Sequence, residues 1–326
     1  MATSHTGLPK KVPPTVFSKR QVLADLVAVD RDPQSQARIL ALENGFRTRV
    51  QAHVASLPLT NARLGAFSTS PFVLLIYAHL KQFTRLSQLE SHIPAAKLFS
   101  SIETSAGRMI EDVALPVYGW QTVPSGMHTA NSALDGKCLH GAVLKAVTLK
   151  SGPRCLNDEM SENFADNVVQ HGPAWLQENG AAQLEFTYGV LYGTRAQSNK
   201  KDWHILRKIA AKLPADHVIQ PPDQRWDCGF ALGTHRATAT IRIGKDWWTY
   251  LGGSDLCLTE VCVALIRACV SPGVADPADQ NYAISDLGAL VAWPSGHPPV
   301  NVLCLQASQL PWLFLLMVHF CDALRD

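Results

Sequence analysis

The 326-residue sequence carries little charge for its length and lacks the signatures of several common enzyme classes. Charged residues make up 17% of it and the formal net charge is only +2, so total charge does not by itself indicate a nucleic-acid-binding protein. The sequence contains no Gly-x-Ser-x-Gly, P-loop or Gly-x-Gly-x-x-Gly motif. These absences argue against serine hydrolases, P-loop nucleotide hydrolases and dinucleotide-binding enzymes.

Cysteine pairs, a signal core and long apolar runs are also missing. The eight cysteines form no Cys-x-x-Cys pair and show no Cys/His spacing typical of zinc sites. The first five residues have no apolar signal core. The most apolar segment, Leu310–Phe320, is too short to span a bilayer. We therefore expect a protein of the reducing cytoplasm with no membrane partner.

What is present is enough apolar sequence for a large core. Hydrophobic residues make up 47% of the chain, and apolar side chains recur at helical spacing over residues 18–29 and 34–55. Residues 1–97 are thus predicted to form a mostly helical region in which no chemistry is evident. From residue 98 the order is helix, strand, strand, helix, strand, helix, then more strand. This order predicts an α/β core over residues 98–326, with a central mixed β-sheet flanked by helices.

The stretch from Ser132 to Pro153 contains the most suggestive charged residues. Asp135 is placed near the end of one short apolar run, and Lys150 ends another run before a tight turn that begins at Ser151. If residues 132–150 form two adjacent strands, the carboxylate and the ammonium reach the same sheet edge, as a metal-dependent phosphodiesterase requires. Each residue alone has a simpler interpretation, since Asp before Gly is common in turns and a lysine can merely end a strand.

Two further positions strengthen the interpretation of Asp135 and Lys150. Residues 148 and 150 of a strand point to the same face, so a site built on Asp135 and position 148 would have Lys150 beside it. An amphipathic helix predicted over residues 98–118 precedes the hairpin and carries Glu111 next to its buried side. The sequence therefore predicts a helix carboxylate near the hairpin pair.

Residues 101–253 resemble type II restriction endonucleases of the PD-(D/E)XK nuclease superfamily. The resemblance is strongest to members with a Lys-Ser-Gly-Pro signature followed by Asn and an acid, as in Lys150-Ser-Gly-Pro-Arg-Cys-Leu-Asn-Asp158. The strand with Tyr188-Gly189, the basic stretch 195–208 and the aromatic segment 246–253 are also similar to that group. The resemblance implies a restriction-endonuclease-like core with DNA-recognition elements toward the C-terminus.

The resemblance also implies roles for individual residues. Asp135 is similar to the first metal-binding Asp, Lys150 to the catalytic Lys, and Glu111 to the helix Glu that some members place near the metal. Thr148 stands where a second acid usually lies, and a hydroxyl is a poor substitute for a carboxylate toward Mg²⁺. Either another carboxylate completes the site or the chain is inactive. The candidates are Glu111, Glu159 and Glu162, and Glu111 is favoured because the other two are expected on a solvated helix face.

The expected function is Mg²⁺-dependent, sequence-specific cleavage of double-stranded DNA that leaves a 5′-phosphate and a 3′-hydroxyl. A palindromic target would favour a homodimer. Two alternatives stay open: an inactive DNA-binding protein and a structure-specific repair nuclease. DNA contacts are expected from basic residues after residue 194, although a solvated helix face would explain the basic segment equally well. These residues are Arg195, Lys200, Lys201, Arg225 and Arg236.

Overall fold

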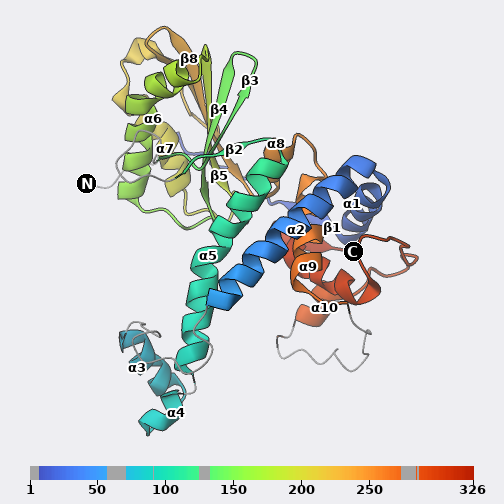
Figure 1. The fold of residues 1–326 in the computed structure, drawn as a ribbon. Helices are drawn as coiled ribbons and strands as arrows, with labels where there is room; N and C mark the ends of the chain where they lie inside the picture. Colours follow the sequence, from blue (N-terminus) through green and yellow to red (C-terminus); the bar gives the residue numbers. More distant parts are fainter. Residues whose placement is uncertain (1–6, 57–70, 91, 125–132, 273–283, 285) are drawn as a thin grey trace.

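Strands that alternate between apolar and polar residues form a seven-stranded mixed sheet with helices on both faces (Figure 1). β8 shows the pattern, because Ala237, Ala239 and Ile241 are buried while the threonines between them are only half-buried. The computed structural model describes residues 7–56, 71–90, 92–124, 133–272, 284 and 286–326. The chain is thus α/β with a mixed sheet flanked by helices, as predicted.

The strand order is β2-β3-β4-β5-β8-β7-β6, in which β4, β5 and β8 run parallel and the other neighbours run antiparallel. The strands are β2 (Gln121–Thr122), β3 (Gly136–His140), β4 (Val143–Lys150), β5 (Gln183–Val190), β6 (Val218–Gln220), β7 (Asp227–Leu232) and β8 (His235–Ile243). The register aligns Lys150 with Val190 and Val190 with Ile243. The parallel strands therefore end together at one edge, here named the carboxyl edge.

Helices come from both halves of the chain, and those between residues 71 and 90 lie away from the sheet (Figure 1). The helices are α1 (Lys19–Arg31), α2 (Pro33–Ser56), α3 (Pro71–Leu80), α4 (Leu86–Glu90), α5 (Ile93–Val117), α6 (Asp158–Glu178), α7 (Lys201–Lys212), α8 (Lys245–Gly252), α9 (Cys257–Cys269), α10 (Leu287–Val291) and α11 (Leu310–Val318). α6 and α7 lie on one face, where they pack on β4 through Leu144 and Ala146. On the other face, Val147 and Leu149 join a second core built with α1, α2, α5, α8, α9 and α11.

Two short strands, one near each end of the chain, pair with each other outside the main sheet. β1 (Val16–Ser18) pairs in parallel with β9 (Ala323–Arg325), and Asp322 accepts a hydrogen bond from the backbone N–H of Thr15 at 2.8 Å. The predicted boundary between residues 97 and 98 falls inside α5. The division into residues 1–97 and 98–326 stays a prediction, and α1 and α2 share a core with α9 and α11.

The predicted hairpin is present, with Gly136 of β3 paired to Val147 of β4. Ser132, where the predicted hairpin begins, lies outside the described residues. One detail is wrong: Asp135 immediately precedes β3 instead of lying near the end of a strand. The reason is the pairing of β3 with β4, because the hydrogen bonds between these strands begin at Asp135. The Asp135 N–H donates to the Val147 carbonyl at 2.8 Å.

Among the described residues, no single helix combines the length and the apolar character needed to cross a membrane. α8 and α9 together meet that test of length and composition, but they are bent by 98° relative to each other.

Candidate active site

The β3–β4 hairpin holds the Asp135 carboxylate at the carboxyl edge. Its Oδ2 atom accepts hydrogen bonds from the Leu149 N–H at 2.6 Å and from the Thr148 hydroxyl at 3.2 Å. Val123 donates its N–H to the Asp135 carbonyl at 3.0 Å, which fixes the backbone from the other side. Thr148 is only 2% exposed, and its hydroxyl orients Asp135 rather than facing the cavity described below.

Close contact between α5 and the start of β3 brings Glu111 over Asp135. A Cβ atom at Gly136 would lie 2.9 Å from Cδ1 of Leu115 and 3.1 Å from Cγ2 of Val147. The missing side chain therefore lets α5 approach the hairpin. Glu111 lies one helical turn before Leu115 and on the same face, so it points toward the hairpin. An Asp-Gly pair often marks a turn. In this protein its glycine instead allows α5 to pack closely on β3.

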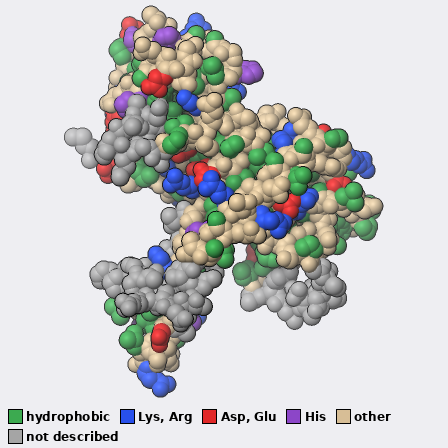
Figure 2. All heavy atoms as spheres, viewed as in Figure 1, with side chains coloured by type: hydrophobic (Ala, Val, Ile, Leu, Met, Phe, Trp, Pro, Cys, Tyr) green, Lys and Arg blue, Asp and Glu red, His purple; other side chains and the backbone are tan. Residues whose placement is uncertain are grey.

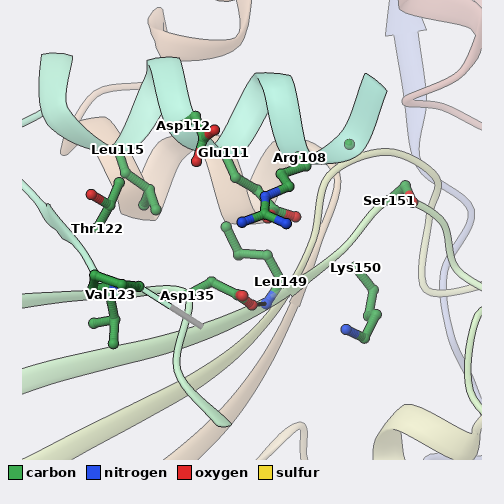
Figure 3. Close-up of a pocket in the computed structure, with 12 residues that line it drawn as sticks. Arg108, Glu111, Asp112, Leu115, Thr122, Val123, Asp135, Leu149, Lys150 and Ser151 are labelled. Carbon is green, nitrogen blue, oxygen red and sulfur yellow. Dashed lines mark hydrogen bonds between the residues drawn. The ribbon is translucent and has the colours of Figure 1, made fainter. Parts of the chain in front are cut away.

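Glu111, Asp135 and Lys150 line one cavity of about 320 Å³ (Figure 3). α5 forms one wall, and the ends of β2, β3 and β4 form the other. The lining residues are Gly107, Arg108, Glu111, Asp112, Leu115, Thr122, Val123, Pro124, Asp135, Leu149, Lys150 and Ser151. The three residues predicted to carry the chemistry thus meet in space, although Glu111 precedes Asp135 by 24 positions in the sequence.

The two carboxylates repel each other in a partly buried setting. Burial raises the pKa of Glu111 from 4.5 to about 8, and the nearby charge of Asp135 adds to the increase. Lys150 acts in the opposite direction on the pKa of Glu111. A carboxyl group with this pKa is largely protonated at neutral pH unless a cation neutralises the pair.

The oxygen donors of this pair fit Mg²⁺. Mg²⁺ is usually bound by one or two carboxylates together with water and substrate phosphate oxygens. No three His, Cys, Asp or Glu residues gather at metal-binding distance in the part of the chain that the structure describes. Glu111 and Asp135 would therefore supply the protein ligands, and solvent and substrate would supply the rest.

Lys150 ends β4 with its ammonium turned away from α5 (Figure 3). Its Nζ atom lies 5.5 Å from the centre of the Phe164 ring of α6, a cation–π contact. The predicted relation to Thr148 is present, since both side chains leave β4 on the face covered by α6 and α7. Lys150 therefore lines the cavity while its ammonium lies toward α6.

The other two candidate carboxylates do not line the cavity. Glu162 forms ion pairs with Lys208, at 2.9 Å, and with Lys212. Glu159 is exposed on α6. Both lie on the solvated helix face that the sequence indicated, so Glu111 is the candidate that meets Asp135.

Most of the predicted DNA-binding residues lie near the carboxyl edge, and they already have partners. Arg195 pairs with Asp246 at 2.8 Å, and Lys201 pairs with Asp158 at 2.6 Å. The Lys200 ammonium lies 5.5 Å from the Trp226 ring centre. Basic and acidic side chains also lie beside each other on the face shown in Figure 2. The basic segment is thus largely neutralised by acids from α6 and α8.

Arg225 and Arg236 differ in their relation to the site. Arg225 precedes β7 and pairs with Asp227 at 2.8 Å. Asp227 is aligned with Thr240, close to the carboxyl end of β8. Arg236 is exposed at the start of β8, seven residues before Ile243 and so about 23 Å from the carboxyl edge. The structure does not bring Arg236 to the candidate site.

Arg108 is a site residue that was not predicted. It lies three residues before Glu111 on α5, and this spacing places both side chains on one helix face. That spacing could have identified Arg108 once Glu111 was chosen.

No model of a known protein family matches the chain, and a comparison with curated proteins finds no match either.

Proposed function

We propose that this protein is a Mg²⁺-dependent endonuclease that cuts double-stranded DNA at specific sequences, as type II restriction enzymes do. The observation that supports it best is the meeting of Glu111, Asp135 and Lys150 in one cavity at the carboxyl edge. A restriction-endonuclease-like core would then consist of α5, the β3–β4 hairpin and the adjacent parallel strands. The cytoplasm is the proposed compartment, and a homodimer is the proposed assembly on a palindromic site.

The proposed chemistry divides among three side chains. Asp135 and Glu111 would hold the cation, and Asp135 is oriented for this by the Leu149 N–H and the Thr148 hydroxyl. Mg²⁺ bound at such a site supplies Lewis acidity toward a phosphate oxygen and lowers the pKa of a water molecule. Lys150 would donate to the phosphate and stabilise the negative charge that develops during attack. The products would carry a 5′-phosphate and a 3′-hydroxyl.

DNA binding is proposed for the basic residues near the carboxyl edge. Arg195 and Lys200 both lie over the Trp226 ring, at 5.0 and 5.5 Å from its centre, which keeps two cations together after β5. Phosphate contacts of this kind would position the duplex without reading its sequence. Arg236 would contact DNA only if the duplex also reached the opposite edge of the sheet.

A plasmid of known sequence tests the proposal directly. The wild-type protein should cut it into discrete fragments with Mg²⁺ and leave it intact with EDTA. Asp135→Ala and Lys150→Ala should each lower the cleavage rate by about 100-fold or more, because each removes a charge that acts on the reacting phosphate. Glu159→Ala, on an exposed acid of α6, is the matched control and should cut like wild type.

Each other outcome has a distinct meaning. Specific cutting that survives both Asp135→Ala and Lys150→Ala would show that the site is assigned wrongly. DNA affinity without Mg²⁺-dependent cutting would identify an inactive DNA-binding protein. A smear or ladder in place of discrete bands would identify a nuclease that recognises ends or structure.

A further inference from the structure

Arg108 extends its guanidinium into the cavity, where its charge interacts with that of Glu111. Its side chain is exposed, and it projects from α5 toward the strand wall beside Glu111 (Figure 3). Within the described residues, no acid or carbonyl accepts a hydrogen bond from it. Asp112, four residues later on the helix, forms an ion pair with Arg49 of α2 at 3.4 Å. A ligand in the cavity can therefore reach the exposed Arg108 guanidinium without displacing a hydrogen-bonded acceptor that belongs to the described residues.

The helix backbone brings Arg108 close to the turn that follows Lys150. A Cβ atom at Gly107 would lie 3.2 Å from the Ser151 hydroxyl oxygen and 3.3 Å from the Ser151 Cβ. The lack of a side chain at Gly107 thus allows α5 to approach the Ser151-Gly152-Pro153 turn. Arg108 leaves the helix at this contact, so the cavity has a guanidinium on its α5 wall and Lys150 on its strand wall.

The cavity must accept a phosphodiester group beside its acidic side chains. Glu111 and Asp135 belong to the proposed cation site and Asp112 pairs with Arg49, so the negative charge that still needs a partner is that of the phosphodiester group. Lys150 is a single flexible donor whose ammonium also contacts Phe164. A guanidinium offers a planar fork that matches two oxygens of one phosphate. The α5 wall has this fork beside Glu111 and across the cavity from Asp135.

We propose that Arg108 is a catalytic residue that binds the two non-bridging oxygens of the phosphodiester group undergoing cleavage. This assignment rests on the proposed nuclease function and names the substrate group that the α5 wall recognises. Lys150 and Arg108 then hold the phosphate from opposite walls, each wall also contributing one of the two carboxylates. Arg108 contacts phosphate oxygens whose negative charge increases during attack. Removing Arg108 therefore lowers the rate of the chemical step more than the affinity for DNA.

Single-turnover cleavage of a DNA fragment containing the mapped site, with Mg²⁺ and the full-length protein, separates these two effects. Varying the protein concentration gives a maximal rate and a half-saturating concentration. Arg108→Ala should lower the maximal rate by about 100-fold, with a much smaller change in half-saturation. Arg108→Lys should recover only part of the rate because it restores the charge without the fork. Added guanidinium ion should accelerate Arg108→Ala and leave Asp135→Ala unchanged.

Arg31→Ala is the charge-matched control, since Arg31 is exposed on α1, and it should cut like wild type. Arg108→Gln keeps the length and polarity of the side chain, and it replaces Arg108→Ala if that variant melts at a lower temperature than wild type. A maximal rate for Arg108→Ala equal to that of Arg31→Ala, while wild type cuts, overturns the assignment and leaves the nuclease proposal standing. A change in half-saturation alone also overturns it. Absence of cutting by wild type removes the nuclease proposal and this assignment with it.

Discussion

At the scale of single residues, Glu111 has the environment that best distinguishes a reactive carboxylate from a structural one. Burial is the main reason its pKa rises to about 8, and the charge of Asp135 is the second. By contrast, the pKa of Glu162 is lowered by its hydrogen bonds to Lys212 and Lys208. Strong perturbation inside a cavity is common at functional sites, whereas an acid held by exposed lysines is typical of a helix surface.

Glu111→Gln should stabilise the protein at high pH in the absence of divalent cations. The pKa of Glu111 is higher in the folded state than its ordinary value of 4.5, so the folded state keeps the proton longer. This contribution to stability is complete below about pH 4.5 and is lost as the pH rises toward about 8. At pH 8–9 the Gln variant should gain about 1–3 kcal/mol in the free energy of unfolding, discounted for partial exposure.

Urea denaturation at a series of pH values in EDTA measures this gain. Glu159→Gln makes the same chemical change on an exposed acid and should leave the pH dependence unchanged. Equal pH profiles for wild type and Glu111→Gln would show that Glu111 titrates normally and that the carboxylate pair is not strained.

At the scale of secondary-structure elements, the site depends on how closely α5 lies on the β3–β4 hairpin. Leu115 contacts the strand at the space left by Gly136, and Glu111 follows one turn away on the same face. Between these two residues, Val113 contacts α2: a Cβ atom at Gly45 would lie 2.6 Å from Cγ1 of Val113, so α5 is also closely packed against α2. The separation of Glu111 and Asp135 is thus set by glycines that have no role in catalysis.

Gly136→Val should push α5 away from the hairpin. The added methyl groups crowd Leu115 and Val147, and overpacking of this kind costs about 1–3 kcal/mol. The cleavage rate should fall as well, because Glu111 moves away from Asp135. Adding Leu115→Ala to Gly136→Val should recover part of both losses, as measured by urea denaturation and Mg²⁺-dependent cleavage. Strictly additive effects of the two changes would contradict close packing at this point.

At the scale of the whole molecule, a buried ion pair joins the N-terminal helices to the C-terminal ones. Glu260 of α9 has no exposed surface. It accepts hydrogen bonds from Arg38 Nε at 2.9 Å, from the Ser35 hydroxyl at 2.6 Å and from the Tyr118 hydroxyl at 2.7 Å. Arg38 and Ser35 belong to α2, and Tyr118 directly follows α5. One carboxylate therefore ties α2 and α9 to the end of the helix that carries Glu111.

Glu260→Ala should lower the free energy of unfolding by about 3 kcal/mol, because Arg38 loses its partner in a largely buried position. Glu90→Ala, on an exposed acid, should have little effect. Since α1 and α2 share a core with α9 and α11, wild type and both variants should each unfold in a single transition by far- and near-ultraviolet circular dichroism. Two transitions would indicate that part of the chain, such as the helical region predicted over residues 1–97, unfolds separately.

Local patterns in the sequence were sufficient for the elements and for the hairpin. Helical spacing predicted α2 within two residues at each end. The period of two along a strand also predicted that Thr148 and Lys150 share a face. β7 was not predicted, because it takes its place in the sheet by pairing with β8 and carries Gly229 in its middle.

Only the tertiary structure decided which charged residues meet. The packing of α5 on Gly136 brings Glu111 and Arg108 close to Asp135. Glu162 instead forms ion pairs with Lys208 and Lys212 of α7. The parallel register placed Arg236 at the far edge of the sheet. Residue types and periodicity describe residues that are close together in the sequence. Helix-on-sheet packing and strand order bring together residues that are far apart in the sequence. The sequence by itself therefore determined the elements and the Asp135–Lys150 hairpin, and the fold determined the composition of the cavity around them.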